Sequence, residues 1–306
     1  MRPQRFRYFS HRSGALSDSI ERTVGVIGGS GLYAMESLED ITETPVDTAF
    51  GAPSDAVISG RIGSTRYLFL PRHGRGHRIP PHRINYRANV LALKQLGAEQ
   101  LISVSAVGSL KEGIAPGDMV LVDQFIDRTR SRPNTFFEDD GVVAHVGFSH
   151  PIDTALSEAL YRACVGAGAR SHRGGAYVCI EGPQFSTLAE SQLFRSWGAS
   201  VVGMTNLPEA RLAREAELPY ATLALATDYD CWHPDHDSVS VETVVAVIQQ
   251  NVSTAQAVLK AVGEHLPDPA LSPASSALEH AIMTSPDAMS AAAKQRLEPL
   301  IGRYFT

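Results

Sequence analysis

Two aspartates follow a long apolar run. Residues 220–226 read YATLALA, and Thr227, Asp228, Tyr229 and Asp230 come directly after them. Side chains two residues apart in an extended strand point to the same face, so we expect both carboxyl groups to reach one ligand. Open α/β sheets bind ligands at this end of their strands. The pair indicates proton transfer or hydrogen bonding to an electron-poor ring, although a solvated turn or a helix cap fits the same pattern.

Two further segments favour an anion site. The glycine-rich run 28–31 follows the first predicted strand, and glycines let backbone N–H groups approach an anion. Arg72 and His73 follow the strand predicted over 67–70, where an arginine can bind phosphate bidentately. Residues 29–34 also fit the loose dinucleotide fingerprint G-x-G-x-x-A. No long crossover helix follows them, however, so phosphate fits better than a nicotinamide cofactor.

Three other predicted strand ends carry groups that can hold a small molecule. Ser105 offers a hydroxyl beside backbone donors. Phe185 can stack on a ring, or belong to the core, and Ser186 follows it. Met204 and Thr205 add a soft apolar side chain and a second hydroxyl. An anion site, an aromatic shelf and a carboxylate pair together predict an enzyme that acts on phosphate and a heterocycle.

The composition excludes several other classes of protein. The net charge of -6 over 306 residues gives no electrostatic footprint for nucleic acid or a membrane. No apolar stretch approaches the ~20 residues needed to span a bilayer. The three cysteines lack CxxC spacing, which indicates reduced thiols and a cytoplasmic location. The histidines near Arg72 lack ligand-like spacing and cysteine partners, so we expect no metal.

Strand and helix patterns alternate, which predicts an α/β fold with a central mixed sheet flanked by helices. The predicted strands are 24–27, 56–59, 67–70, 101–105, 119–122, 176–180, 201–204 and 220–226. The predicted helices are 86–96, 154–167, 188–197, 208–217, 241–262 and two pieces after residue 275. Thr187 and Glu190 have capping-box spacing, and Asn206 is predicted to cap the helix that begins near Pro208.

The chain divides into three parts. Residues 1–22 are basic and lack an apolar signal core, which predicts a disordered extension. Residues 23–266 form the single α/β domain. Residues 267–306 begin with a Pro/Ser-rich joint, and we expect them to form a helical appendage packed on the same domain.

Six motifs in register resemble a known family. They read VGVIGGSGLY, LPRHGRGH, NYRANVLALKQLGAEQLISVSAVGSL, PGDMVLVDQFIDRT, IEGPQFSTLAES and GMTNLPEARLAREAELPYATLALATDYDCW. Together they resemble the trimeric branch of the purine nucleoside phosphorylase superfamily, from about residue 24 to residue 266. The resemblance implies a nucleoside phosphorylase-like fold and phosphorolysis of 5'-methylthioadenosine to adenine and 5-methylthioribose 1-phosphate, a step of purine and methionine salvage.

The resemblance also implies a role for each candidate residue. Asp228 is the general acid at purine N7, and Asp230 raises its pKa and meets the 6-amino group. The phosphate ligands are Ser30, Arg72, His73, Ala106 through its backbone, and Thr205. The remaining substrate contacts are Ser105, Phe185, Ser186 and Met204, with Val241, Val244 and Val245 around the methylthio group. His145 reaches a neighbour's site, so the active unit is a homotrimer with interface sites, and phosphate is a co-substrate without any cofactor.

Three alternatives stay open. A 6-oxopurine phosphorylase would be expected to carry Asn in place of Asp228, and an NAD-dependent oxidoreductase would use the run 28–31. A regulatory RNA-binding module would use the arginines between residues 72 and 87. Departures from the family pattern are Gln184 in place of Arg, Ser30 in place of Thr, and Asn206-Leu207 in place of Thr-Val; none removes a predicted catalytic group.

Overall fold

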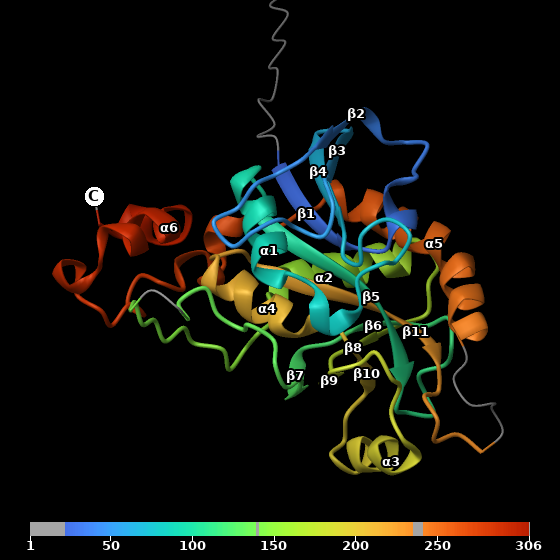
Figure 1. Ribbon diagram of the computed structural model, residues 1–306. Helices are drawn as coiled ribbons and strands as arrows, with labels where there is room; N and C mark the ends of the chain where they lie inside the picture. The colour runs from blue at the N-terminus through green and yellow to red at the C-terminus, as the bar shows by residue number, and fades with distance from the viewer. Residues whose placement is uncertain (1–21, 139–140, 235–240, 306) are drawn as a thin grey trace, which may run out of the picture.

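The computed structural model describes residues 22–138, 141–234 and 241–305, whose strands form one mixed sheet (Figure 1). Its principal path runs β2-β3-β4-β1-β5-β10-β9-β7, and β11, β6 and β8 branch from β5. The strands are β1 Arg22–Gly28, β2 Glu39–Thr44, β3 Val57–Ile62, β4 Thr65–Pro71, β5 Gln100–Ser109, β6 Met119–Leu121, β7 Gln124–Arg128, β8 Ser171–Arg173, β9 Ala176–Ile180, β10 Val201–Gly203 and β11 Tyr220–Asp228.

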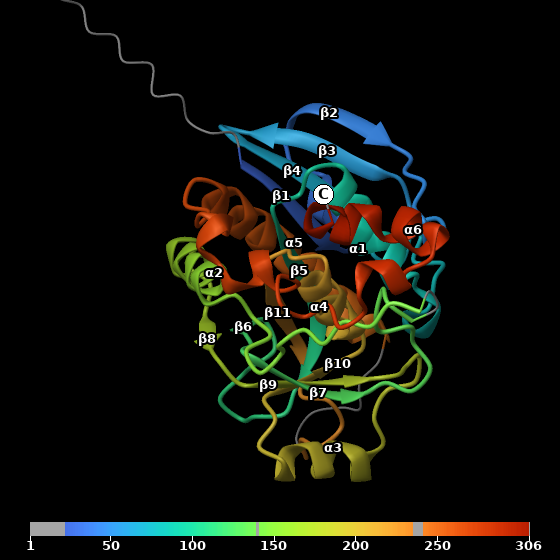
Figure 2. The same cartoon turned by 90° about the vertical axis from the view of Figure 1, so that its left-hand side faces the viewer.

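Helices cover both faces of this sheet. They are α1 Tyr86–Gln95, α2 Thr154–Gly166, α3 Leu188–Ser196, α4 Asn206–Glu215, α5 Val241–Gly263 and α6 Ala291–Ile301. Short 3-10 helices are η1 Ser30–Tyr33, η2 Pro81–Arg83, η3 Pro269–Leu271, η4 Pro273–Ser276, η5 Pro286–Ala288 and η6 Gly302–Tyr304. Figure 2 shows α2 and α5 on one side of the sheet and α1 and α4 on the other. No helix among the described residues is long and apolar enough to cross a membrane.

Strand β5 is the centre of the sheet because three strands pair with it. β1 runs parallel to its first part, β11 runs parallel to it from Leu101 to Gly108, and β10 runs antiparallel to its last residues. Every residue of β11 except Asp228 is buried. Strands that are buried on both faces read as continuous apolar runs rather than alternating ones, which is why 220–226 predicts this strand so clearly.

The predicted α/β class and mixed sheet are confirmed, and every predicted strand overlaps an observed one. The strands that the sequence patterns missed are β2, β7 and β8. β2 reads EDITET and is almost wholly exposed, so it has no apolar period to detect. After residue 275 the structure has one α-helix, α6, together with short 3-10 turns instead of two helical pieces.

One predicted helix cap is confirmed and one is wrong. Thr187 accepts from the backbone N–H of Glu190, whose carboxylate accepts in return from Thr187, as a capping box requires. Asn206 does not cap α4, because its side chain points into the core. There its amide donates to Tyr220 and Thr222, at 2.7 and 2.8 Å. Its Oδ1, the atom that would cap the helix, accepts instead from the Ser105 hydroxyl at 2.9 Å.

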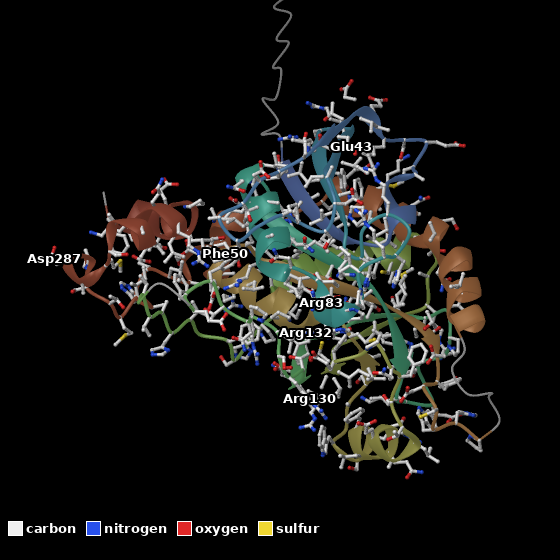
Figure 3. The ribbon with its side chains drawn as sticks, viewed as in Figure 1. Glu43, Phe50, Arg83, Arg130, Arg132 and Asp287 are labelled. Atoms are coloured by element: carbon white, nitrogen blue, oxygen red, sulfur yellow. The ribbon has the colours of Figure 1, made fainter. Side chains whose placement is uncertain are left out.

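The C-terminal segment joins the same core as the sheet. Leu297 and Leu300 of α6 are buried in the main apolar cluster. Glu217 holds this segment by its carboxylate, which accepts from the backbone N–H of Leu278 at 2.9 Å and pairs with Arg303 at 2.6 Å. In Figure 3, Asp287 marks the outer end of this segment, well away from the sheet.

Glu215 carries a buried carboxylate that ties α4 to the loop after β7. It is 6% exposed and accepts from the Thr135 hydroxyl and the Phe136 N–H, each at 2.7 Å. Burial raises the pKa of Glu215 to about 7, although both hydrogen bonds act in the opposite direction. Desolvation therefore outweighs the two donors at this site.

This raised pKa predicts a pH-dependent stability. Folded Glu215 binds its proton more tightly than the unfolded chain does, so its contribution is greatest below about pH 4.3 and is lost as pH rises towards 7. We expect the free energy of unfolding to fall by up to about 3 kcal/mol across this window. Glu215→Gln should remove that slope in urea unfolding measured at a series of pH values. The exposed Glu279→Gln should leave it unchanged, and equal slopes in all three proteins would contradict the assignment.

Candidate active site

Several strand ends converge around β5. β11 runs parallel to β5 and places Asp228 opposite Gly108, whereas β10 runs back along the end of β5 and returns Met204 towards Ala106. A cavity of about 100 Å³ lies between them. The predicted residues that line it are Ala106, Phe185, Ser186, Met204, Asp228 and Asp230. The structure thus brings the predicted base-binding residues together with Ala106, predicted to bind phosphate, and Met204, predicted to lie under the ribose.

The two aspartates share this cavity because of a turn, so the strand-alternation explanation is wrong. β11 ends at Asp228, and Asp230 adopts left-handed backbone angles, with φ of 52°. The backbone N–H of Asp230 donates to Asp228 Oδ1 at 2.7 Å, which closes the turn. Asp228 Oδ2 accepts from the Thr227 hydroxyl at 2.6 Å.

Both carboxyl groups are shielded from water. Burial raises the pKa of Asp228 against the hydrogen bonds from Thr227 and Asp230. Burial also raises the pKa of Asp230, with the Asp228 charge acting in the same direction and the Ser191 and Ser186 hydroxyls in the opposite one. Among the described residues, Asp230 Oδ2 and the hydroxyls of these two serines are buried without a hydrogen bond of ordinary geometry. Buried polar atoms are rarely left unpaired in proteins, so this corner suits a ligand that donates hydrogen bonds.

Arg72 is a predicted phosphate ligand, but most of its hydrogen-bond donors already bind protein acceptors. Its guanidinium is almost fully buried and forms a bidentate pair with Glu209, at 2.9 and 3.2 Å. It also donates to the carbonyls of Ile27 and Val104 and to the Ser103 hydroxyl. Glu209 thus makes the bidentate contact with Arg72 that the sequence led us to expect for phosphate. Nη1 makes only the bond to Val104, which leaves one N–H for a ligand.

His73 is a neutral imidazole at physiological pH. Its Nδ1 lies 2.8 Å from the Ile79 carbonyl, so the proton resides there and Nε2 keeps its lone pair. The pKa of His73 is lowered to about 4, chiefly by burial and also by the Arg72 charge, although the Ile79 bond acts in the opposite direction. The ring stacks on His77, with centroids 4.1 Å apart. His73 can therefore accept a hydrogen bond from a protonated phosphate oxygen.

Thr205 and Ser105 differ in their availability. Thr205 precedes α4, yet its side chain makes no capping bond, and its backbone N–H donates to the Tyr177 hydroxyl at 3.4 Å. Its own hydroxyl therefore does not cap the N-terminus of this helix. Ser105 instead donates to Asn206 Oδ1 at 2.9 Å inside the buried network. Ser105 thus belongs to the buried hydrogen-bond network beside the site.

Other predicted residues lie apart from the cavity or cannot be placed. The side chains of Ser30, Val241 and Val244 lie outside the described part of the structure. Val245 is 44% exposed. His145 is exposed, and its segment pairs with the C-terminal part of the chain, where its N–H donates to the Ala281 carbonyl at 2.9 Å.

Three residues of the site had no role in the sequence patterns. Glu209 pairs with Arg72, Arg132 binds the carbonyls of Met204 and Glu181, and Gly108 faces both aspartates. Arg132 stands in an arginine-rich loop that gives no periodic signal. Gly108 carried one available signal, because a glycine inside a strand marks a close approach of another group.

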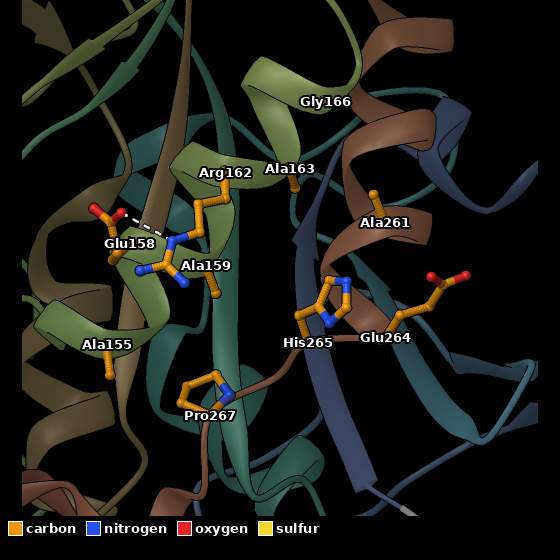
Figure 4. Close-up of a pocket in the computed structure, with 10 residues that line it drawn as sticks. All are labelled: Ala155, Glu158, Ala159, Arg162, Ala163, Gly166, Ala261, Glu264, His265 and Pro267. Atoms are coloured by element: carbon orange, nitrogen blue, oxygen red, sulfur yellow. Dashed lines mark hydrogen bonds and ion pairs between the residues drawn. The ribbon is translucent and has the colours of Figure 1, made fainter.

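A larger cavity, of about 690 Å³, lies between α2 and α5 (Figure 4). Its lining includes the alanines of α2 together with Glu158, Arg162, Glu264 and His265. Glu158 and Arg162 pair with each other at 3.1 Å, and no predicted site residue lines this cavity. Among the described residues, no group of three or more His, Cys, Asp or Glu side chains is arranged to hold a metal.

The chain is similar in sequence to known phosphorylases. Residues 23–264 match the model of the phosphorylase superfamily. S-methyl-5'-thioadenosine phosphorylase of Geobacter sulfurreducens is 54% identical over 286 residues, which cover 93% of this chain and 100% of that protein. The chain belongs to the S-methyl-5'-thioadenosine phosphorylase family. The family member of Synechocystis is 53% identical over 293 residues, with 94% and 90% coverage.

Solved structures of the family agree with this assignment. A methylthioadenosine phosphorylase from an antarctic soil metagenomic library has a TM-score of 0.86 and 45% identity, covering 92% of this chain and 99% of its own. The Schistosoma mansoni methylthioadenosine phosphorylase in complex with adenine has a TM-score of 0.77 and 36% identity, covering 80% and 92%. The family and fold predicted from the sequence are confirmed.

Proposed function

We propose that this chain catalyses phosphorolysis of 5'-methylthioadenosine to adenine and 5-methylthioribose 1-phosphate. The names of its relatives support the substrate. The observation that carries the proposal is the buried Asp230 carboxylate beside the cavity at the end of β11, whose Oδ2 makes no hydrogen bond of ordinary geometry within the described residues and has the Ser186 and Ser191 hydroxyls near it. The 6-amino group of adenine supplies a donor to this carboxylate. A 6-oxo base would present an acceptor there, and an unpaired buried polar group costs roughly 1–3 kcal/mol.

Asp228 acts in this mechanism as the proton donor to purine N7. Bond cleavage leaves negative charge on the departing base, and a proton delivered at N7 neutralises it. Burial raises the pKa of Asp228 and so increases the fraction that carries a proton near neutral pH. Phe185, which is 45% exposed at the mouth of the cavity, packs on the purine ring.

Phosphate attacks the anomeric carbon from the side of Arg72. The Ala106 backbone, the Thr205 hydroxyl and the neutral His73 ring bind its oxygens, and Ser30 closes the site from η1. The Arg72 charge acts mainly through its field, because Glu209 holds most of its donors. The reaction needs no cofactor, since phosphate is the second substrate. Val241, Val244 and Val245 line the methylthio end of the site in this proposal.

The active unit in this proposal is a homotrimer, and His145 completes a neighbour's site. His145 does not line the cavity that holds Asp228 and Asp230. Two apolar side chains of the same paired segments are exposed, Val143 by 46% and Met283 by 67%, which fits a contact with a second copy. The three free cysteines fit the reducing cytoplasm, where we place the enzyme.

The reaction is tested by phosphate-dependent release of adenine. Methylthioadenosine should be cleaved fastest, adenosine more slowly, and methylthioinosine and inosine least of all. Asp228→Asn should lower kcat for methylthioadenosine by about 100-fold, because the variant cannot donate the proton, and shift the preference towards the 6-oxo substrates. Unchanged turnover of methylthioadenosine in this variant would refute the role of Asp228.

Gly108 predicts a second effect on the carboxylate pair. A Cβ at this position would lie 3.0 Å from Asp228 Oδ1 and 3.2 Å from Asp230 Cβ. Gly108→Ala should therefore displace both aspartates and lower kcat/KM at least about tenfold, while costing about 1 kcal/mol of stability. Gly113→Ala is the matched control, because no atom lies within 4 Å of its added Cβ. Equal kcat/KM in the two variants would show that the aspartates tolerate the crowding.

The shared site predicts complementation between inactive subunits. Light scattering should give about three times the chain mass of 33.0 kDa. His145→Ala should lower kcat/KM about tenfold, as loss of one substrate contact does. Mixed oligomers of His145→Ala and Asp228→Asn chains should exceed both parents in activity, because some sites then combine both native residues. If the mixture only averages its parents, His145 does not act on a neighbour.

A further inference from the structure

Arg132 is a buried side chain near the active site that binds several backbone carbonyls. Its side chain is 1% exposed and lies inside the molecule, whereas the neighbouring Arg130 points outward (Figure 3). Nη1 donates to the carbonyls of Met204 and Leu207, at 2.6 and 2.8 Å. Nη2 donates to the carbonyls of Ile180 and Glu181, at 3.3 and 2.5 Å.

These carbonyls belong to two different segments of the site. Ile180 and Glu181 end β9 and begin the loop to Phe185 and Ser186. Met204 follows β10, lines the cavity and precedes Thr205. A single planar guanidinium, which presents its donors in a fixed fork, therefore connects the segment that faces the base with the segment that faces ribose and phosphate.

The two segments that Arg132 joins pack closely against each other. A Cβ added to Gly182 would lie 2.6 Å from Met204 Sδ. Leu207 has non-helical backbone angles inside α4, with φ of −119° and ψ of 136°, which turn its carbonyl out of the helical bonding pattern and towards Arg132. An arginine at this point satisfies backbone acceptors that neither segment satisfies alone.

The guanidinium itself is fixed from two sides. The Tyr86 hydroxyl accepts from Nη1 at 3.0 Å while donating to the Pro81 carbonyl, also at 3.0 Å. The Glu181 carboxylate lies 3.2 Å from Nε and balances the charge. These contacts hold the Arg132 guanidinium in one position, and its Nη1 and Nη2 groups set the separation of the two segments.

We propose that Arg132 is a positioning residue that registers the base-binding loop 181–186 against Met204 and Thr205. This inference rests on the proposed phosphorolysis. The nucleophilic phosphate must lie in line with the bond to the base, and the two are held by the two segments that Arg132 joins. Displacement of reacting groups by about 1 Å can cost about 100-fold in rate. Arg132 therefore acts on the chemical step more than on the binding of either half of the substrate.

The test separates rate from affinity in Arg132→Lys. Lysine keeps the charge but lacks the planar fork. We expect kcat for methylthioadenosine to fall about 100-fold, while the dissociation constant of adenine measured by calorimetry changes by less than about threefold. Arg170→Lys is the control, because Arg170 also joins a carbonyl, that of Gly113, and a carboxylate, that of Asp118, away from the predicted site. Its kcat should stay within about twofold of the wild-type value.

Several outcomes would overturn the proposal. A folded Arg132→Lys with kcat within threefold of wild type would do so, as would equal proportional losses of kcat and adenine affinity. If that variant does not fold, Glu181→Gln is the alternative test, since it removes the charge beside Nε while the amide oxygen of Gln can still accept from the Arg130 backbone N–H. A fall in kcat of about tenfold supports the proposal, and a change below twofold overturns it. Failure of the wild-type chain to release adenine would instead defeat the proposed function.

Discussion

The buried ion pair between Arg72 and Glu209 is the contact on which the centre of this protein depends. Arg72 follows β4 and Glu209 lies on α4, and their closest atoms are 2.9 Å apart with both side chains almost fully buried. The arginine also binds carbonyls of β1 and β5, and the glutamate accepts from Tyr220 of β11 at 3.0 Å. One pair of charges therefore joins four parallel strands to the helix that packs on them.

Such a pair stabilises a fold only when its remaining hydrogen bonds are complete, because desolvation of two charges otherwise exceeds their attraction. Here Ser103, Tyr220 and the surrounding carbonyls complete them. A consequence for the proposed site is that the Arg72 charge is fixed in place and cannot follow a ligand. Electrostatic stabilisation of this kind requires no reorganisation during the reaction. In the proposed function, the groups that contact phosphate can then be neutral ones, such as the His73 ring and the Thr205 hydroxyl.

The sequence predicted where the site lies better than how its side chains are used. Buried strands such as β11 and β5 are continuous apolar runs, so their ends could be found and the polar residues after them identified. The partners of those residues depend on chain segments far away in the sequence. Arg72 pairs with Glu209, 137 positions away, and Ser105 with Asn206, 101 positions away. A local pattern contains neither distance, which is why Arg72 was expected to grip phosphate and Asn206 to cap a helix.

The turn after β11 shows the same limit at short range. Strand alternation predicts that Asp228 and Asp230 share a face, and they do share a cavity, but only because the strand ends and Asp230 turns into left-handed geometry. The backbone N–H of Asp230 thereby donates to Asp228, while Asp230 Oδ2 can accept from a ligand. Arg72 and Arg132 have the complementary arrangement, since protein acceptors take most of their donors. These two positive side chains thus hold the framework in place, whereas the oxygens of Asp230 and Ser186 that line the cavity are left, in the part of the chain that the structure describes, without a hydrogen bond of ordinary geometry.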